Sequence, residues 1–152
     1  MKILIATDGS KFSKEAVDFT ADIVSRPDIT EVKIITVIEP FALNEIETLI
    51  ESVEELADPS NEEARQAKEK ADQMAAAFKG KFPGTKINVT SEIIGGPAAP
   101  TIVEKAETWG ADLIVVGSHG RGFWKRSWLG SVSDRVVHHA PCAVMVVKAK
   151  SA

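Results

Sequence analysis

Short aliphatic runs recur along the chain and are separated by segments with helical periodicity. The runs at 2–7, 31–39, 85–94, 112–117 and 142–147 are dominated by aliphatic residues and have no helical period. Short apolar runs bounded by turn-forming residues are typical of buried β-strands. The pattern therefore predicts five strands.

Helices are predicted between these strands. In 13–25, apolar side chains recur every three or four residues, as in a helix that lies on a sheet. A capping-box pattern at Ser60 and Glu63 and a typical stop signal at Gly80 predict a helix over 61–79.

Three further segments complete the pattern. A loop and helix are predicted over 95–110, and a short helix over 131–140, which Pro141 ends because proline cannot continue a helix. The segment 41–57 is also predicted to be helical, within a charge-rich connection, 41–80, that is longer than usual.

The order of these elements predicts the fold. Aliphatic strands that alternate with helices form mainly parallel sheets with helices on both faces. Polar or glycine residues end the first strand, at Thr7 and Asp8, and the fourth, at Gly117. If these strands are neighbours where the strand order reverses, the order is 3-2-1-4-5 and a ligand binds in the crevice between them. We expect a single three-layer α/β/α, Rossmann-like domain over 1–152.

Composition limits the kind of protein. The chain has 152 residues, of which 44% are hydrophobic and 26% charged, as in an ordinary globular domain. No apolar run approaches the ~18 residues of a membrane span, and the N-terminus does not resemble a signal peptide. The single Cys142 agrees with a reducing compartment, so we expect a cytoplasmic protein. The net charge of −4 argues against a nucleic-acid coat or a membrane-surface binder.

The glycine-rich segment 115–132 carries the candidate chemistry. It leads into a helix whose first turn has unpaired N–H groups and the positive end of the helix dipole, which suit a phosphate. Gly130 would let a phosphate oxygen approach the main chain, and Ser131 and Ser133 could add hydroxyl donors. The loop before this helix supplies cationic side chains that could neutralise charge, namely Arg121, Lys125 and Arg126.

Each of these residues also has a structural interpretation. Gly130 and Ser131 could simply cap a helix, and the cationic loop could simply be solvated; only the combination favours anion binding. Two familiar nucleotide motifs are missing, because no Gly-Lys-Ser/Thr sequence occurs and Gly117, Gly120 and Gly122 do not follow the dinucleotide order.

The sequence GSHGRGFWKRSWLGS, with the spacing G-2x-G-9x-G-S, resembles the ATP-binding signature of the universal stress protein family. The resemblance continues through ILIATDGS, IIGGPAAPTIVEKAETWGADLIVVGSHG and PCAVMVVK. It implies a fold similar to the adenine nucleotide alpha hydrolases, a stress-response or regulatory role, a homodimer, and binding of ATP, ADP or AMP with Mg²⁺ held through the phosphates. The residues that it places around the nucleotide are Thr7, Asp8 and Val37 at the adenine and ribose, Gly117, His119 and Gly120 along the ribose and phosphates, and Gly130, Ser131, Val132 and Ser133 at the phosphate chain.

Other functions stay open. One alternative is a slow Mg²⁺-dependent ATP hydrolase or phosphoryl transferase, and another is a nucleotide-free interaction module with an unknown protein partner. No catalytic residue is predicted, because Ser118 and His119 are adjacent on a turn and seldom adopt the geometry of a nucleophile and its base. No metal site is predicted either, since His138 and His139 suit a helix end.

The fifth strand predicts an assembly. In the order 3-2-1-4-5 it lies at the edge of the sheet, and it contains no proline or inward charge that would discourage pairing with another chain. We expect two copies to pair antiparallel through Ala143 to Val147 around a two-fold axis.

Overall fold

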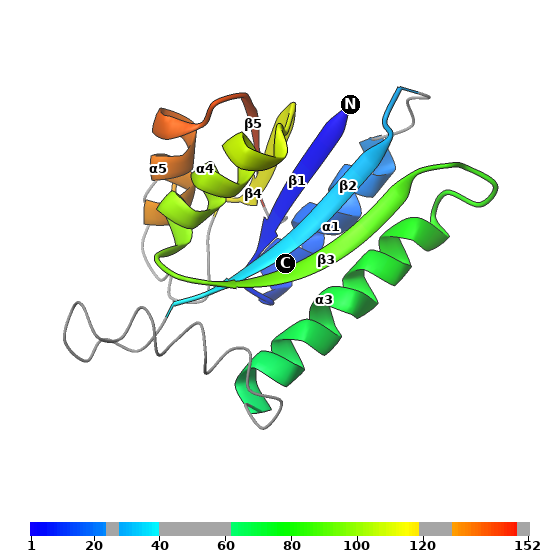
Figure 1. The fold of residues 1–152 in the computed structure, drawn as a ribbon, viewed down its shortest axis with the longest axis horizontal. Coiled ribbons are helices and arrows are strands. Elements are labelled where there is room, and N and C mark those ends of the chain that lie inside the picture. Colours follow the sequence, from blue (N-terminus) through cyan, green and yellow to red (C-terminus); the bar gives the residue numbers. More distant parts are fainter. Residues whose placement is uncertain (24–27, 40–61, 119–128, 149–152) are drawn as a thin grey trace.

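A parallel sheet forms the centre of the molecule. The computed structural model describes residues 1–23, 28–39, 62–118 and 129–148. Within these residues all neighbouring strands pair in parallel, in the order β3-β2-β1-β4-β5 (Figure 1). The predicted α/β fold and strand order are therefore confirmed. The strands are β1 (Lys2–Thr7), β2 (Glu31–Ile38), β3 (Asn88–Gly95), β4 (Leu113–Gly117) and β5 (Ala143–Val147).

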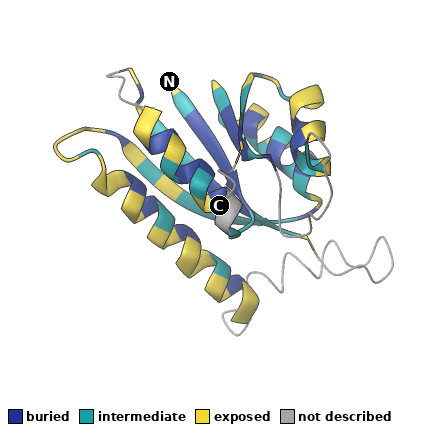
Figure 2. Cartoon of the chain, turned by 180° about the vertical axis from the view of Figure 1, so that it is seen from behind, coloured by how far each residue is buried: buried dark blue, intermediate teal, exposed yellow. Residues whose placement is uncertain are grey.

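Helices cover both faces of this sheet. The described helices are α1 (Lys11–Ile23), α3 (Glu62–Gly80), α4 (Ala98–Trp109) and α5 (Ser131–His139). One face carries α1 and α3 and the other carries α4 and α5, which gives three layers (Figures 1 and 2). In the described part of the chain, no helix is long and apolar enough to cross a membrane.

Two hydrophobic cores, one on each face of the sheet, hold the layers together. A single strand contributes to both, because its alternate side chains point to opposite faces. Ile3 and Ile5 of β1 lie in the core under α1 and α3, whereas Leu4 and Ala6 lie in the core under α4 and α5. Burying one large aliphatic side chain contributes about 1.5–3 kcal/mol. The near absence of polar residues in β1 follows from this burial on both faces.

α1 begins earlier than the predicted start at Ser13. Ser10 caps it, since the Ser13 N–H donates to Ser10 Oγ at 3.3 Å and the Lys14 N–H donates to the Ser10 carbonyl at 3.1 Å. The Ser10 hydroxyl therefore accepts a hydrogen bond from an N–H of the first turn that otherwise lacks a partner.

β3 begins at Asn88, later than the predicted start at Thr85. The Thr85 N–H donates to the Phe82 carbonyl at 3.3 Å, and Gly84 adopts a φ of 77°, so a turn occupies this position. The predicted helix over 41–57 and the predicted cap at Ser60 lie outside the described residues.

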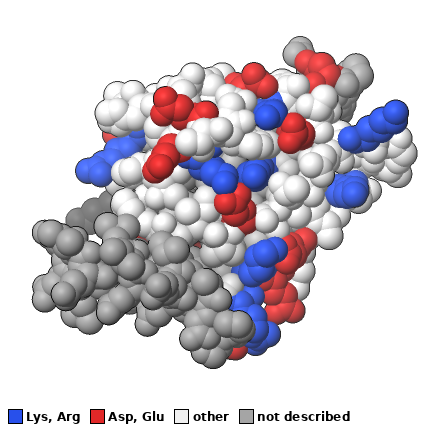
Figure 3. Space-filling model, viewed as in Figure 1, with Lys and Arg blue, Asp and Glu red and all other residues white. Residues whose placement is uncertain are grey.

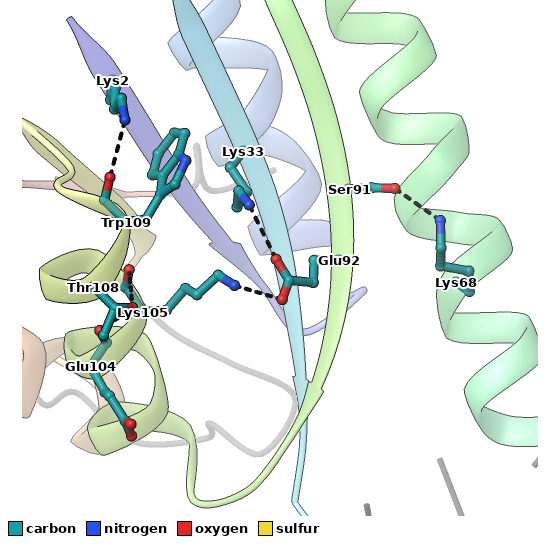
Figure 4. A network of polar contacts seen from close by, with 9 residues as sticks. All are labelled: Lys2, Lys33, Lys68, Ser91, Glu92, Glu104, Lys105, Thr108 and Trp109. Carbon is teal, nitrogen blue, oxygen red and sulfur yellow. Dashed lines mark hydrogen bonds and ion pairs between the residues drawn. The ribbon is translucent and has the colours of Figure 1, made fainter. Parts of the chain in front are cut away.

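A polar network joins α4 to the sheet (Figure 4). Glu92 of β3 accepts hydrogen bonds from Lys105 at 2.6 Å and from Lys33 at 3.3 Å, while the ammonium groups of Lys2 and Lys33 lie 5.4 and 5.2 Å from the Trp109 ring centre. Burial alone would raise the pKa of Glu92, but the two lysines outweigh it and hold this pKa below its ordinary value. On the face seen in Figure 3, acidic and basic side chains are interspersed.

Candidate functional site

The carboxyl end of β1 forms a tight, hydrogen-bonded turn. Thr7 Oγ1 donates to Ser13 Oγ at 2.7 Å and accepts from the Gly9 N–H at 3.0 Å, and Asp8 Oδ1 accepts from the Ser10 N–H at 2.9 Å. Gly9 has a φ of 73°, a conformation that favours glycine. These contacts fix where Asp8 stands at the end of the strand.

A cavity of about 290 Å³ opens beside this turn, between the ends of β1 and β4. This is the switch point at which the sequence predicts a crevice. The predicted residues that line it are Thr7, Asp8, Val37, Gly117, Gly130, Ser131, Val132 and Ser133. Two predicted residues, His119 and Gly120, lie outside the described residues, as do the cationic residues Arg121, Lys125 and Arg126. Since no ligand is present, the binding roles of all these residues stay predictions.

Five lining residues were missed by the sequence analysis: Ala6, Ser13, Ala98, Ile102 and Val116. Ser13 carried a usable signal, because a serine on the core-facing stripe of a helix needs a polar partner. Ala98 and Ile102 carried none, because their place at the cavity depends on how α4 packs on the sheet.

The floor of the cavity is apolar. Val116 and Ile102 are each 3% exposed and belong to the core under α4 and α5. Gly117, the last residue of β4, also lines the cavity and adds no side chain to it. Such a floor suits the flat face of a sugar or a base, with polar groups confined to the rim.

The N-terminus of α5 forms one rim of the cavity. Gly130 is its N-cap, with φ −71° and ψ 158°, and provides no side-chain cap. The Gly130 N–H donates to the Ser118 carbonyl at 2.8 Å, and the first helical hydrogen bond runs from the Asp134 N–H to the Gly130 carbonyl at 2.9 Å. The N–H groups of Ser131, Val132 and Ser133 belong to the first turn, where helix geometry supplies no acceptor.

The two serines of this turn differ in their surroundings. Ser133 is 3% exposed, and its hydroxyl faces inward, 2.9 Å from the Gly130 carbonyl oxygen and 3.3 Å from that of Ser118. Ser131 is exposed. The hydroxyl of Ser133 therefore holds the start of the helix, and only that of Ser131 faces outward as a donor.

The helix starts near the cavity can be compared directly. Ser10 caps α1, and Glu39 caps α4 by accepting a hydrogen bond from the Ala98 N–H at 2.9 Å. The N-cap residues of α4 and α5 are Pro97 and Gly130, and neither of them provides a side-chain cap itself. Among the described residues, a side chain therefore accepts an N–H at the starts of α1 and α4 and none does so at α5. The N-terminus of α5 lines the cavity and suits an anion.

Ser118, His138 and Cys142 are residue types that often occur in catalytic or metal sites, and their surroundings are as follows. Ser118 is 4% exposed, and its carbonyl accepts from Gly130. His138 lies in the last turn of α5, with Nδ1 2.8 Å from the Asp134 carbonyl oxygen. Burial raises the pKa of the Cys142 thiol, which is half-buried against the core. Within the described ranges, no group of three His, Cys, Asp or Glu side chains could hold a metal ion.

The fold and the cavity define an α/β protein with a candidate ligand crevice at the switch point of a parallel sheet. A family model described as the universal stress protein family matches residues 1–148, and the chain belongs to this family.

Individual relatives agree with this assignment. Universal stress protein MJ0531 of Methanocaldococcus jannaschii is 40% identical over 149 residues, which cover 97% of this chain and 81% of that protein. The solved structure of hypothetical protein MJ0577 has a TM-score of 0.78 at 30% identity, covering 99% of this chain and 97% of that one. A universal stress protein solved in complex with cAMP has a TM-score of 0.65 at 23% identity, and the match covers 97% of this chain and 96% of that one.

Proposed function

We propose that this protein binds an adenine nucleotide, ATP, ADP or AMP, in the crevice between β1 and β4 and acts in regulation or the stress response through its occupancy. The observation that carries the proposal is the N-terminus of α5, which lines the cavity without a side-chain cap. A phosphate would accept hydrogen bonds from the N–H groups of Ser131, Val132 and Ser133, and the helix dipole would favour its charge.

The remaining lining residues fit a nucleotide with its phosphates at this end. Because glycine has no side chain, Gly130 would leave room for the phosphates and Gly117 for the ribose. Thr7, Asp8 and Val37 line the same cavity and would contact the adenine and the ribose. In the family member solved with cAMP, the same fold accommodates an adenine nucleotide. Mg²⁺ would be held through the phosphates. We expect slow hydrolysis or none, because phosphoryl transfer needs an oriented nucleophile and we assign no residue to that role.

Thermal unfolding with ATP and Mg²⁺ tests the proposal. A ligand that binds only the folded state stabilises it by about 2.7 kcal/mol at 100 times its Kd, so the melting temperature should rise. The variant Gly130→Val should lose this rise, because a branched side chain would occupy the place of the phosphate. Its φ and ψ suit valine, so the fold should persist.

A matched control is Gly80→Ala, at the end of α3, where an added Cβ would meet nothing within 4 Å. The control should keep the full ATP response. No rise for the wild-type protein at millimolar ATP would contradict nucleotide binding, and an equal rise in Gly130→Val would mean that the phosphates bind elsewhere.

The proposal includes a homodimer through β5. The Ser118 N–H donates to the Val147 carbonyl, so the main chain of Val147 faces β4. By strand alternation, Val144 and Val146 direct their main-chain groups to the other side, where the described residues provide no strand. This edge suits antiparallel pairing with a second copy. The cytoplasmic location expected from the sequence stays a prediction.

A further inference from the structure

A single buried hydroxyl lies at the centre of the turn between β1 and α1. It belongs to Ser13, the third residue of α1, which is 4% exposed. Ser13 Oγ accepts a hydrogen bond from Thr7 Oγ1 at 2.7 Å and donates one to the Ser10 carbonyl at 3.0 Å. Thr7 precedes Asp8 and Gly9 in the chain, and Ser10 follows them. The hydroxyl of Ser13 therefore joins the two ends of the turn that contains Asp8.

The hydroxyl protons of this pair are used inside the protein. A hydroxyl has one proton to donate, and that of Ser13 is donated to the Ser10 carbonyl. The proton of Thr7 is donated to Ser13, and the sulfur of Met74, 3.9 Å from Thr7 Oγ1, is only a weak acceptor. Thr7 and Ser13 both line the cavity. Their hydroxyls nevertheless donate to protein atoms, so they hold the turn instead of a ligand.

The contacts of Ser13 lead to the carboxylate of Asp8 through Ser10. Ser13 holds Ser10 twice, because its N–H also donates to Ser10 Oγ at 3.3 Å. The Ser10 N–H in turn donates to Asp8 Oδ1 at 2.9 Å. On the other side of the turn, the Gly9 N–H donates to Thr7 Oγ1 at 3.0 Å. Asp8 is thus fixed at the rim of the cavity by a hydrogen-bonded chain that passes through Ser13.

We propose that Ser13 is a positioning residue for nucleotide binding, and that it acts through Asp8 without donating a hydrogen bond to the ligand. The inference rests on the proposed nucleotide binding. A side chain that must be ordered during binding reduces the affinity, so a turn that is fixed in advance binds more tightly. The family resemblance places Thr7 and Asp8 at the nucleotide and gives Ser13 no role.

The first test compares two variants that each lose a buried hydroxyl from the same face of α1. Ser13→Ala removes the hydroxyl of the turn. The matched control is Thr20→Val, since Thr20 is 0% exposed and its hydroxyl donates to the Ala16 carbonyl at 2.7 Å, away from the turn. Both variants should be less stable than the wild type. In calorimetry with Mg²⁺, only Ser13→Ala should weaken ATP binding, by roughly two- to tenfold, the effect of one hydrogen bond on an equilibrium constant.

A double-mutant cycle tests whether the effect passes through Asp8. In an Asp8→Ala background, Ser13→Ala should cause no further loss of ATP affinity, because two changes that act through one contact are not additive. Thr7→Val removes the other partner of the same hydrogen bond and keeps the branched shape of the side chain. It should give the same result in the cycle, and it takes the place of Ser13→Ala if that variant does not fold.

Amide hydrogen exchange, followed by NMR on the protein without ATP, gives an independent measurement. Ser13→Ala should speed exchange at the N–H groups of Gly9 and Ser10, whereas Thr20→Val should not. The assignment would be overturned by unchanged exchange, by unchanged ATP affinity in a folded Ser13→Ala variant, by an equal loss in Thr20→Val, or by an undiminished loss in the Asp8→Ala background. If the wild-type protein binds no ATP, the proposed function itself fails, and the exchange rates still show whether Ser13 holds the turn.

Discussion

The two serines of the first turn of α5 should separate stability from ligand binding. Ser133→Ala removes the hydroxyl that faces the carbonyl oxygens of Gly130 and Ser118, whereas Ser131→Ala removes an exposed hydroxyl. Both changes delete one oxygen from the same helical turn. They therefore form a matched pair that differs only in the direction of the side chain.

The magnitude follows from the contacts. A buried hydrogen bond contributes about 0.5–1.5 kcal/mol. Both carbonyls keep a backbone donor without it, from Asp134 and from Gly130, so no acceptor is left unpaired. Alanine also has a helix propensity up to about 0.5 kcal/mol better than that of serine. We therefore expect Ser133→Ala to lower the free energy of unfolding by roughly 0.5–1 kcal/mol, or about 1–4 °C in melting temperature.

Ser131→Ala should leave the melting temperature of the unliganded protein unchanged and reduce the rise produced by ATP. Differential scanning fluorimetry with and without ATP and Mg²⁺ measures both quantities on the same samples. The reasoning would be refuted by equal destabilisation of the two variants, because the structure gives only Ser133 a partner inside the protein.

Two further predictions concern the polar network and the assembly. Glu92 has a lowered pKa in the folded state, so its stabilisation is present above its unfolded pKa near 4.5 and is lost as the pH falls through the folded value. Urea unfolding should show Glu92→Gln less stable than the wild type by under about 1 kcal/mol at pH 7, since the group is partly exposed. This difference in the free energy of unfolding should shrink as the pH is lowered below 4.5, and a constant difference would contradict the reasoning. Val146→Pro removes an N–H on the open side of β5, so light scattering should show a dimeric wild type and a folded, monomeric variant, and a monomeric wild type would exclude the dimer.

The strands could be predicted because their burial on both faces leaves a direct record in the sequence. Ile3, Leu4 and Ile5 are consecutive and fully buried, a pattern that a solvent-exposed helix cannot have. Helix and strand starts were less accurate, because they depend on single contacts. The Ser10 cap of α1 and the turn at Gly84 before β3 are examples.

The part of the candidate site that is marked by glycines could be predicted from the sequence. Gly117 and Gly130 stand out as glycines at the end of a strand and the start of a helix, and both line the cavity. A second cavity, between α3 and the ends of β1 and β2, could not be predicted, because the alanines that line it, Ala67 and Ala71, look like any helical residues. They line a cavity only because α3 packs beside the ends of these two strands.

The proposed anion site at the N-terminus of α5 shows what the structure adds to the sequence. Every helix has unpaired N–H groups in its first turn, so this part of the sequence argument for a phosphate at α5 applies equally to α1 and α4. The structure separates them, because Ser10 and Glu39 already accept hydrogen bonds at those two helix starts. At α5 the capping position is Gly130, and the nearby hydroxyl of Ser133 faces inward to backbone carbonyls. A glycine at this position lacks the side chain that would cap the helix and stabilise it. The proposed phosphate would replace such a cap by accepting hydrogen bonds from the same N–H groups.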